Sequence, residues 1–188
     1  MKSYLQMNDN FDTVLRIMYG PAVYTHPDHL EELMRCNNTW NEALINLWLI
    51  EYYQLEDLPE GWSPGCHTTS LILAYWKRLP NVAYLIGSYL LRSQLILQGA
   101  RLAADTRLLA FISLPLAHQV DPGAAMPCDS ATAYGIAFIR SISANLPHAL
   151  QQRMALCFPR DNTHVICKAA PTPDHINLLK MAMIYAND

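Results

Sequence analysis

The densest group of side chains able to bind a metal is His26-Pro27-Asp28-His29, where two imidazoles and a carboxylate fall within four residues. Both kinds of group are common zinc ligands. A structural role is favoured, because Pro27 stiffens the chain between the histidines and no second pair of ligands follows at a typical spacing. X-Pro-Asp is also ordinary chemistry for the start of a helix. We therefore predict no metal and no cofactor.

Other patterns that could support catalysis are weak. The chain contains no GxxxxGK[ST], GxGxxG or HExxH motif, which argues against an NTPase, a dinucleotide enzyme and a zincin. Glu31-Glu32 and Glu56-Asp57 are adjacent carboxylates in polar surroundings. Neighbours on a helix point to different faces, so solvated charge explains these pairs better than acid–base catalysis. We predict that the protein is not an enzyme, and an assembled site around His26 and His29 is the minor alternative.

The five cysteines are widely spaced and form no CxxC pair. This spacing argues against a disulfide framework or a structural zinc site and indicates buried free thiols in a reducing compartment. They are Cys36, Cys66, Cys128, Cys157 and Cys167.

The elements that must position these residues are helices separated by prolines. Apolar residues recur with helical spacing, the twelve prolines fall mostly between such segments, and strand-like alternation is missing apart from residues 163–167. We predict an all-α fold: a single compact helical domain of about eight helices with proline-rich connections and at most one short strand pair. The expected helices cover 11–19, 29–35, 40–55, 70–79, 81–99, 104–116, 131–146, 148–158 and 173–186.

Several residues mark where these helices begin. Thr39 with Glu42 resembles a capping box, Thr68 or Thr69 and Asp129 or Ser130 are candidate caps, and Thr172 precedes Pro173. Pro80 is expected to break or kink the chain between two helices. The helix over 40–55 has one wide apolar face. That face comprises Trp40, Ala43, Leu44, Leu47, Trp48, Ile50 and Leu55.

The expected domain covers residues 1–188. The alternative is a small N-terminal unit, 1–60, joined by the loop 56–69 to a main helical body, 70–188. Two uncharged apolar stretches, 79–91 and 108–120, are each about 13 residues long, well short of the roughly 20 that span a bilayer. The N-terminus also lacks the apolar region of a secretory signal. We therefore expect no membrane insertion.

Charge is unevenly distributed along a chain whose net charge is only −3. Residues 28–60 hold eight acidic side chains against one basic side chain, and residues 77–107 hold five basic against one acidic. Either the two segments are separate docking faces, or they pack together and neutralise each other. The basic segment is too apolar and too sparse in Lys and Arg for a nucleic-acid groove, so no nucleic-acid partner is expected.

The segment 76–99, WKRLPNVAYLIGSYLLRSQLILQG, combines three features: Trp followed by basic residues and Leu-Pro, an Ala-Tyr-Leu-x-Gly core, and Leu-Arg followed by Gln-Gly. Two weaker patterns flank it, YGPAVYTHPDHL at 19–30 and residues 134–159. In these features and their order the chain resembles the OrgA/MxiK family, the SctK component of bacterial type III secretion systems.

The resemblance implies a cytoplasmic, bacterial protein at the inner-membrane face of the injectisome. It would link the cytoplasmic domain of the SctD-type ring protein to the SctQ-type pod protein, with SctL and SctN as indirect partners. The alternative is a helical chaperone-like or regulatory module for an apolar partner, using Met126, Met154, Met181 and Met183.

Burial preferences of apolar side chains suggest that most of the recognised motif serves the fold, with Gly87 allowing close helix approach and Arg92 requiring a partner if buried. Motif residues expected to be structural are Pro21, Trp76, Leu79, Pro80, Ala83, Tyr84, Gly87, Arg92 and Gly99. Docking is expected at the acidic stretch and the polar N-terminal corner. The candidate partner-binding residues are Tyr24, His26, Asp28, His29, Glu31, Glu32, Glu56, Asp57, Lys77 and Arg78.

Overall fold

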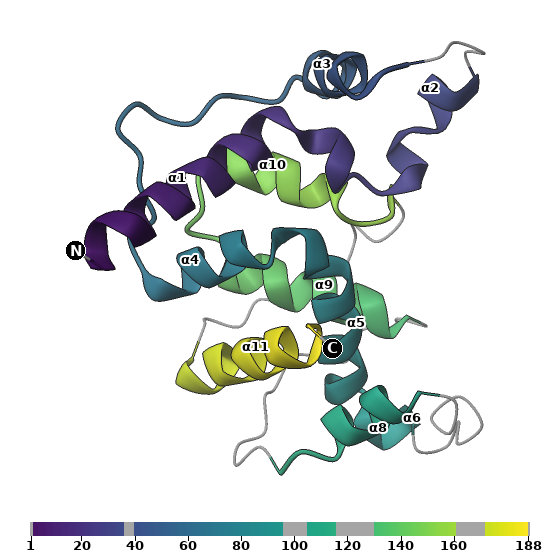
Figure 1. Ribbon diagram of the computed structural model, residues 1–188. Coiled ribbons are helices and arrows are strands. Elements are labelled where there is room, and N and C mark those ends of the chain that lie inside the picture. The colour runs from purple at the N-terminus through teal and green to yellow at the C-terminus, as the bar shows by residue number, and fades with distance from the viewer. Residues whose placement is uncertain (1, 36–39, 96–104, 116–129, 161–171, 188) are drawn as a thin grey trace. The chain divides into compact units, whose positions relative to one another are not determined.

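A computed structural model of the protein describes residues 2–35, 40–95, 105–115, 130–160 and 172–187. Over these ranges the ordered elements are α- and 3₁₀-helices and no strand is present, which confirms the predicted all-α class (Figure 1). The short strand expected at 163–167, and with it Gly99, lies outside the described residues.

The chain folds into two compact units, each formed by two separate stretches of sequence. Unit 1 comprises Met1–Lys77 and Asn145–Asp161, and unit 2 comprises Arg78–Ala144 and Asn162–Asp188. The boundary falls inside the recognised segment 76–99, whereas the loop 56–69 lies within unit 1. Unit 1 holds eleven acidic and six basic residues, a formal charge of −5, and unit 2 holds five acidic and seven basic residues, a formal charge of +2. The single-domain organisation stays a prediction.

Helices of unit 1 enclose a core built from both parts of its chain. Its elements are α1 (Lys2–Tyr19), η1 (Pro21–Val23), η2 (Pro27–His29), α2 (Glu31–Arg35), α3 (Glu42–Tyr52), α4 (His67–Ala74) and α10 (His148–Leu156), with η3 (Trp76–Arg78) at its boundary. Val14, Ile17 and Met18 form the buried stripe of α1 at helical spacing. Helix α1 packs against α3, α4 and α10, and Figure 1 shows α10 alongside it. Unit 1 is therefore closed by a helix that follows α4 by more than 70 residues in sequence.

Unit 2 is organised around a close crossing of two helices. Its elements are α5 (Leu79–Leu90), α6 (Arg92–Leu95), α8 (Thr106–Ile112), α9 (Ala131–Ile142) and α11 (Pro173–Tyr185). Where α5 meets α9, a Cβ added at Gly87 would collide with the Ala131 carbonyl, and one at Gly135 would collide with the Ala83 backbone. Small residues four apart on both helices thus let the two backbones touch, as expected at Gly87.

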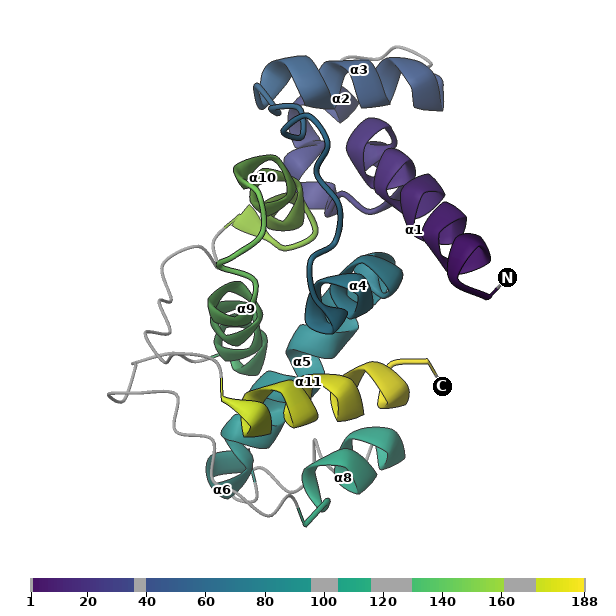
Figure 2. The same ribbon diagram turned by 90° about the vertical axis from the view of Figure 1, so that its left-hand side faces the viewer.

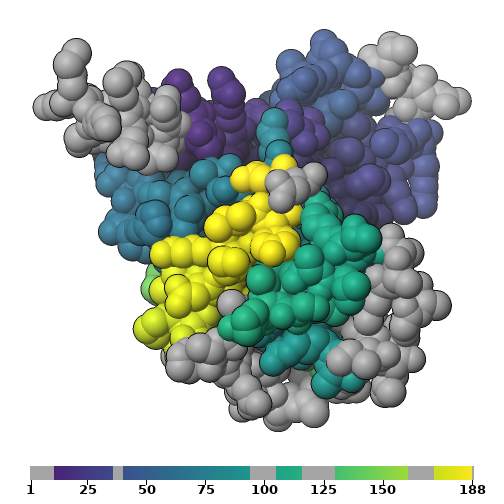
Figure 3. All heavy atoms as spheres, turned by 60° about the horizontal axis from the view of Figure 1, so that its bottom comes forward, coloured from purple at the N-terminus to yellow at the C-terminus, as the bar shows by residue number. Residues whose placement is uncertain are grey.

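Helices α8 and α11 cover the α5–α9 pair through aromatic contacts. Tyr89 of α5, Phe111 of α8 and Tyr185 of α11 pack edge to face, with ring centroids 5.9 and 5.3 Å apart along the series. Figure 3 shows α8 and α11 side by side on one face of the molecule. Arg92 places its guanidinium 4.2 Å from the Tyr89 ring centroid and donates to the Tyr89 carbonyl, which supplies the partner that its position requires.

Several helix ends match the sequence signals. Helix α1 ends at Tyr19, directly before Gly20-Pro21, and α10 begins directly after Pro147. Thr172 caps α11 in a reciprocal capping box with His175, with Pro173 in the first turn. These boundaries depend on local chemistry, which the sequence displays directly.

Other predicted ends were wrong. Helix α1 begins at Lys2 instead of Phe11, since no proline or glycine interrupts residues 2–10. Helix α3 is capped by Asn41, whose side chain accepts from Leu44 N at 2.9 Å, and Thr39 of the predicted Thr39–Glu42 capping box lies outside the described residues. The helix also stops before Gln54, whose positive φ of 49° is left-handed.

The break predicted at Pro80 lies earlier in the chain. Helix α4 is capped at Cys66 and ends at Ala74, a 3₁₀ turn follows, and Pro80 sits in the first turn of α5, where its missing N–H costs nothing. The expected helix 81–99 likewise divides into α5 and α6 at Leu91.

The apolar residues of α3 do not all face the core. Leu49 is fully buried, and Asn46 turns toward η1, accepting from Ala22 N at 2.8 Å. Leu44 and Leu47, both members of the expected apolar face, are exposed to solvent. Figure 2 places α3 at the edge of unit 1, with α1 and α2 on its inner side.

Candidate interaction site

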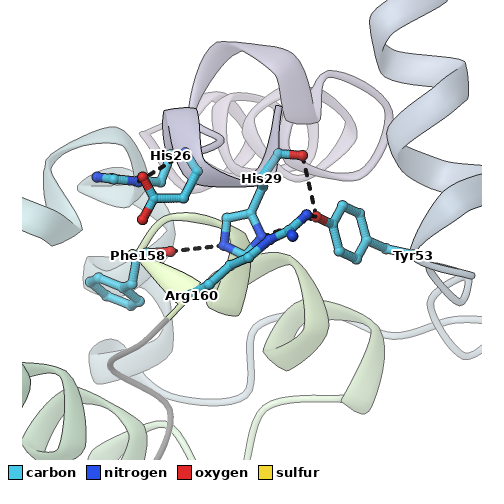
Figure 4. A network of polar contacts seen from close by, with 6 residues as sticks. His26, His29, Tyr53, Phe158 and Arg160 are labelled. Atoms are coloured by element: carbon cyan, nitrogen blue, oxygen red, sulfur yellow. Dashed lines mark hydrogen bonds and ion pairs between the residues drawn. The ribbon is translucent and has the colours of Figure 1, made fainter. Parts of the chain in front are cut away.

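A hydrogen-bonded cluster joins three separate segments of unit 1 around His29 (Figure 4). The His29 Nε2 lies 2.8 Å from the Phe158 carbonyl oxygen, and its Nδ1 lies 3.2 Å from the Tyr53 hydroxyl. Arg160 donates to the same hydroxyl over 2.7 Å. The cluster therefore connects η2, the end of α3 and the residues that follow α10.

The bond to Phe158 fixes the tautomer of the neutral His29 ring. A carbonyl oxygen only accepts, so Nε2 carries the proton, and Nδ1 lies beside the Tyr53 hydroxyl, which donates to the His29 carbonyl oxygen over 3.2 Å. Burial lowers the pKa of His29, the bond to Phe158 acts in the opposite direction, and the Arg160 charge adds to the lowering. Burial therefore favours the neutral imidazole, whose Nε2 ties η2 to the residues after α10 and whose Nδ1 faces Tyr53.

His26 and Asp28 form a smaller local motif. The His26 Nδ1 accepts from Asp28 N at 3.3 Å and lies 3.2 Å from the Asp28 carboxylate, so the imidazole caps η2. His26 N donates to the Leu156 carbonyl, which ties this turn to α10. Within the described ranges, no three His, Cys, Asp or Glu side chains are arranged to hold a metal ion.

Tyr24 and Pro21, the other residues singled out in this corner, are buried. The Tyr24 hydroxyl donates to the Ile17 carbonyl over 2.7 Å, and its ring packs edge to face on Trp76 at 5.9 Å. Burial raises the pKa of Tyr24 far above its ordinary range. Tyr24 and His29 thus make their contacts inside unit 1, and the solvent-facing part of the corner is His26 and Asp28.

The acidic candidates lie on the surface of unit 1. Glu31 and Glu32 are exposed on α2, and Glu56 and Asp57 are exposed just after α3. Glu31 pairs with Arg35 one turn away at 3.7 Å, and Glu56 lies 3.1 Å from His148. These exposed pairs contribute little to stability, so the carboxylates are available to a partner.

The basic candidates flank the unit boundary. Lys77 and Arg78 are exposed, next to the buried Trp76. Arg78 donates to the Ala186 carbonyl over 2.7 Å, at the C-terminal cap of α11, where a cation is favoured by the helix dipole. Arg78 therefore has a structural contact, whereas Lys77 remains a surface charge.

The recognised motif divides clearly by burial. Trp76, Leu79, Ala83 and Gly87 are buried, Pro80 and Arg92 are half-buried, and Tyr84 reaches the surface. Of the methionines that would line a chaperone-like groove, Met154 and Met183 are buried core residues, Met181 is half-buried, and Met126 lies outside the described residues. That core packing gives the chaperone alternative no support.

Two further features were not among the residues predicted from the sequence. Arg153, in the middle of α10, is fully buried and donates to the carbonyls of Met18, Glu56 and Ala149 at 2.7–3.1 Å. Nothing in its local sequence separates it from a surface arginine. Residues 61–65, GWSPG, match the GxSxG pattern of α/β-hydrolase nucleophiles. They occupy the loop between α3 and α4 and have no strand before them, so the context that the motif requires is missing.

Comparison with known proteins decides the family. A family model described as a bacterial type III secretion apparatus protein (OrgA_MxiK) matches residues 14–188. The chain belongs to the OrgA/MxiK family. It is also 31% identical over 157 residues to the oxygen-regulated invasion protein OrgA of Salmonella typhimurium strains LT2, SL1344 and 14028s, covering 77% of this chain and 73% of OrgA. No solved structure matches the chain.

Membership of the OrgA/MxiK family confirms the resemblance drawn from residues 76–99. The match extends over both compact units and includes the whole of α10 and α11. None of the helices in the described part of the chain is both long and apolar enough to cross a membrane. The family is one of secretion apparatus proteins, and the role within that apparatus is a matter of proposal.

Proposed function

We propose that this chain is a non-enzymatic adaptor of the type III secretion injectisome. It would lie in the cytoplasm at the inner membrane and link the cytoplasmic domain of an SctD-type ring protein to an SctQ-type pod protein. SctL and SctN would be held indirectly, through the pod protein. The observation that carries the proposal is the OrgA/MxiK family match over residues 14–188.

The organisation of the chain supports a two-partner role. Each compact unit has its own core, and the units carry formal charges of −5 and +2. Surfaces of opposite charge favour different partners and disfavour exchange between them. The acidic candidates belong to unit 1, and Arg78 with most of the basic segment belongs to unit 2.

A non-enzymatic role is supported by how the polar cluster of unit 1 is used. Both ring nitrogens of His29 face internal partners, and His26 caps the turn that precedes α2. A general base needs an accessible nitrogen or carboxylate next to a substrate cleft. These groups are instead committed to joining η2, α3 and the end of α10.

Co-purification tests the proposal directly. The full chain, immobilised through a tag, is mixed with an SctQ-type protein and with an SctD-type cytoplasmic domain, separately and together. We expect each to bind, and all three to elute as one complex. SctL and SctN should be retained only when the SctQ-type protein is present.

The control is a folded sample, shown by a cooperative thermal transition in circular dichroism. A folded chain that retains neither protein contradicts the adaptor role. A chain that retains one partner and never both contradicts the link and leaves a single-partner role.

A further inference from the structure

Helix α3 is apolar around nearly its whole circumference, an unusual property for a helix at the edge of a unit. Its inner side packs through Leu49, which is 0% exposed, and through Asn46 on η1. Helices that are apolar all round are normally buried on every side. The outer side of α3 therefore has the composition of an interface without a covering element in the described part of this chain.

The outer side forms one continuous apolar surface. Leu44, Trp48 and Tyr52 follow one another at spacings of four residues, and Leu47 lies next to this row, one turn before Glu51. Leu44, Leu47 and Tyr52 are 45%, 52% and 47% exposed. Large side chains exposed together on one helix face mark a binding surface more often than scattered single residues do.

The aromatic side chains of this surface are also held in place before a partner binds. The Trp48 and Tyr52 rings stack at 4.6 Å with an interplanar angle of 17°, and Tyr53 packs edge to face against both. Glu32 accepts a hydrogen bond from the Tyr52 hydroxyl, and this raises the pKa of Tyr52. Rigid aromatic side chains bind with little loss of rotamer entropy, and Trp and Tyr are the residues most enriched at interface hot spots.

Acidic side chains lie beside this apolar surface. Glu51 is exposed on α3 one turn after Leu47, and the exposed Glu32 of α2 accepts from the Tyr52 hydroxyl. Charge complementarity therefore favours a partner with lysine or arginine beside its apolar residues. It disfavours a second copy of α3, whose glutamates would face their own like charges, and it disfavours an anionic membrane.

We propose that the outer face of α3 binds an amphipathic helix of another protein, whose apolar stripe is flanked by lysine or arginine. Ridges formed by residues four apart on α3 are the geometry into which a second helix packs. The inference rests on the proposed function in one respect, namely that the partner is a protein of the secretion apparatus. Leu44, Leu47, Trp48 and Tyr52 supply the apolar contact, and Glu51 and Glu32 supply the charge preference.

A pair of synthetic helices tests the chemistry without any secretion protein. Fluorescence anisotropy measures the affinity of the full chain for a leucine–lysine amphipathic helix and for its leucine–glutamate counterpart. We expect the leucine–lysine helix to bind at least about tenfold more tightly. The double substitution Leu44→Asp with Leu47→Asp should weaken that binding about tenfold or more, because it places charge in the centre of the apolar contact.

The matched control is Leu109→Asp with Ile184→Asp, which makes the same kind of change at exposed apolar residues of unit 2. It should leave the affinity unchanged. The charge reversal Glu51→Lys should shift the preference toward the leucine–glutamate helix. Equal affinity for both peptides, or equal losses in the two aspartate double variants, overturns the inference.

Binding of the secretion apparatus proteins is the second test of the α3 proposal. Leu44→Asp with Leu47→Asp should abolish binding of either the SctD-type domain or the SctQ-type protein and leave the other intact. If the wild-type chain binds its partners and the double variant binds both equally well, the α3 inference fails and the adaptor role stands. If the wild-type chain binds neither, the adaptor role fails, and the peptides still report on α3.

Self-association is checked by light scattering on the same samples. The expected result is the same molar mass for the wild-type chain and the double variant. A wild-type dimer that Leu44→Asp with Leu47→Asp converts to a monomer would assign α3 to a second copy of the chain and overturn the proposal.

Discussion

Arg153 holds unit 1 together from inside. Its guanidinium reaches Met18 at the end of α1, Glu56 in the loop after α3, and Ala149 within α10. Burial lowers the pKa of Arg153, but arginine stays protonated in proteins, so the cation depends on these carbonyls for its solvation. The Met18 carbonyl also lies in the last turn of α1, the negative end of the helix dipole.

Replacing Arg153 should therefore be costly. We expect Arg153→Met to lower the free energy of unfolding by about 3 kcal/mol or more, because three carbonyls, two of them in buried bonds, lose this donor. Arg153→Lys should recover only part of the loss, since one nitrogen cannot occupy both the Nε and the Nη1 positions from which Arg153 donates. Urea unfolding measures both variants.

Arg35→Met serves as the comparison, because Arg35 pairs with Glu31 in an exposed position. That substitution should change the free energy of unfolding by less than about 0.5 kcal/mol. An Arg153→Met variant as mild as Arg35→Met would show that the buried contacts are not stabilising.

His29 makes stability depend on pH. Its pKa is lowered in the folded protein by burial, whereas the unfolded chain titrates near 6.5. Below that value the unfolded state binds the extra proton, so the contribution of His29 is complete above about pH 6.5 and is lost as the pH falls through it. The lowered pKa of His175 acts with the same sign in unit 2.

The substitution His29→Gln should reduce this dependence without removing it, by at most about 1.4 kcal/mol per pH unit. Urea unfolding at pH 7.5 and at pH 5.5 gives the two slopes. A slope as steep in His29→Gln as in the wild-type protein would mean that other groups, and not His29, carry the acid sensitivity.

At the scale of elements, the crossing of α5 and α9 depends on having no side chains at two positions. Gly87→Ala and Gly135→Ala each place a methyl group onto the opposing backbone. Alanine should gain about 1 kcal/mol of helix propensity. The collision outweighs this gain, and we expect a net loss of about 2 kcal/mol or more in the free energy of unfolding.

Gly65→Ala is the matched change, since a Cβ there meets nothing within 4 Å. Its thermal midpoint should stay close to that of the wild-type chain. If Gly135→Ala melted at the same temperature as Gly65→Ala, the close approach of α5 and α9 would not be needed for stability.

The helices also show which of their ends can be predicted from the sequence and which cannot. Helix ends at Gly20-Pro21, Pro147 and Thr172 were predicted because a residue's own chemistry decides them. Asn41 was missed as a cap because Thr39, two residues earlier in the sequence, offers the same capping chemistry, and local chemistry does not choose between them. For α3, the spacing of the apolar residues predicted an apolar helix. Which side of that helix turns inward depends on the contact between Asn46 and η1, and the periodicity of α3 alone carries no information about η1.

The candidate site was predictable in part for the same reason. The acidic residues were expected at the surface and are exposed there. Tyr24 and His29 stand out as polar residues in sequence, yet their partners, Trp76 and Phe158, are distant in the chain. Long-range contacts of this kind, like those of Arg153, leave no trace in a local pattern.

At the scale of the whole molecule, the two units should respond separately to a local defect. Hydrogen exchange of the Arg153→Met variant should accelerate in α1, α4 and α10 of unit 1 more than in α5 and α9 of unit 2. Gly135→Ala should give the opposite pattern. Uniform acceleration along the whole chain in both variants would contradict two separate cores.

The course of the chain through these units also bears on its synthesis. Residues 1–77 leave the ribosome before 78–144, yet unit 1 is closed only by 145–161, which bring α10 and Arg153. The amino-terminal helices must therefore wait for α10 and the Arg153 contacts while all of α5 and α9 is translated, and until then α3 and α4 are the helices available to pack on α1. A fragment that ends before residue 145 should leave the core of unit 1 incomplete, which makes products of premature termination substrates for chaperones and proteases.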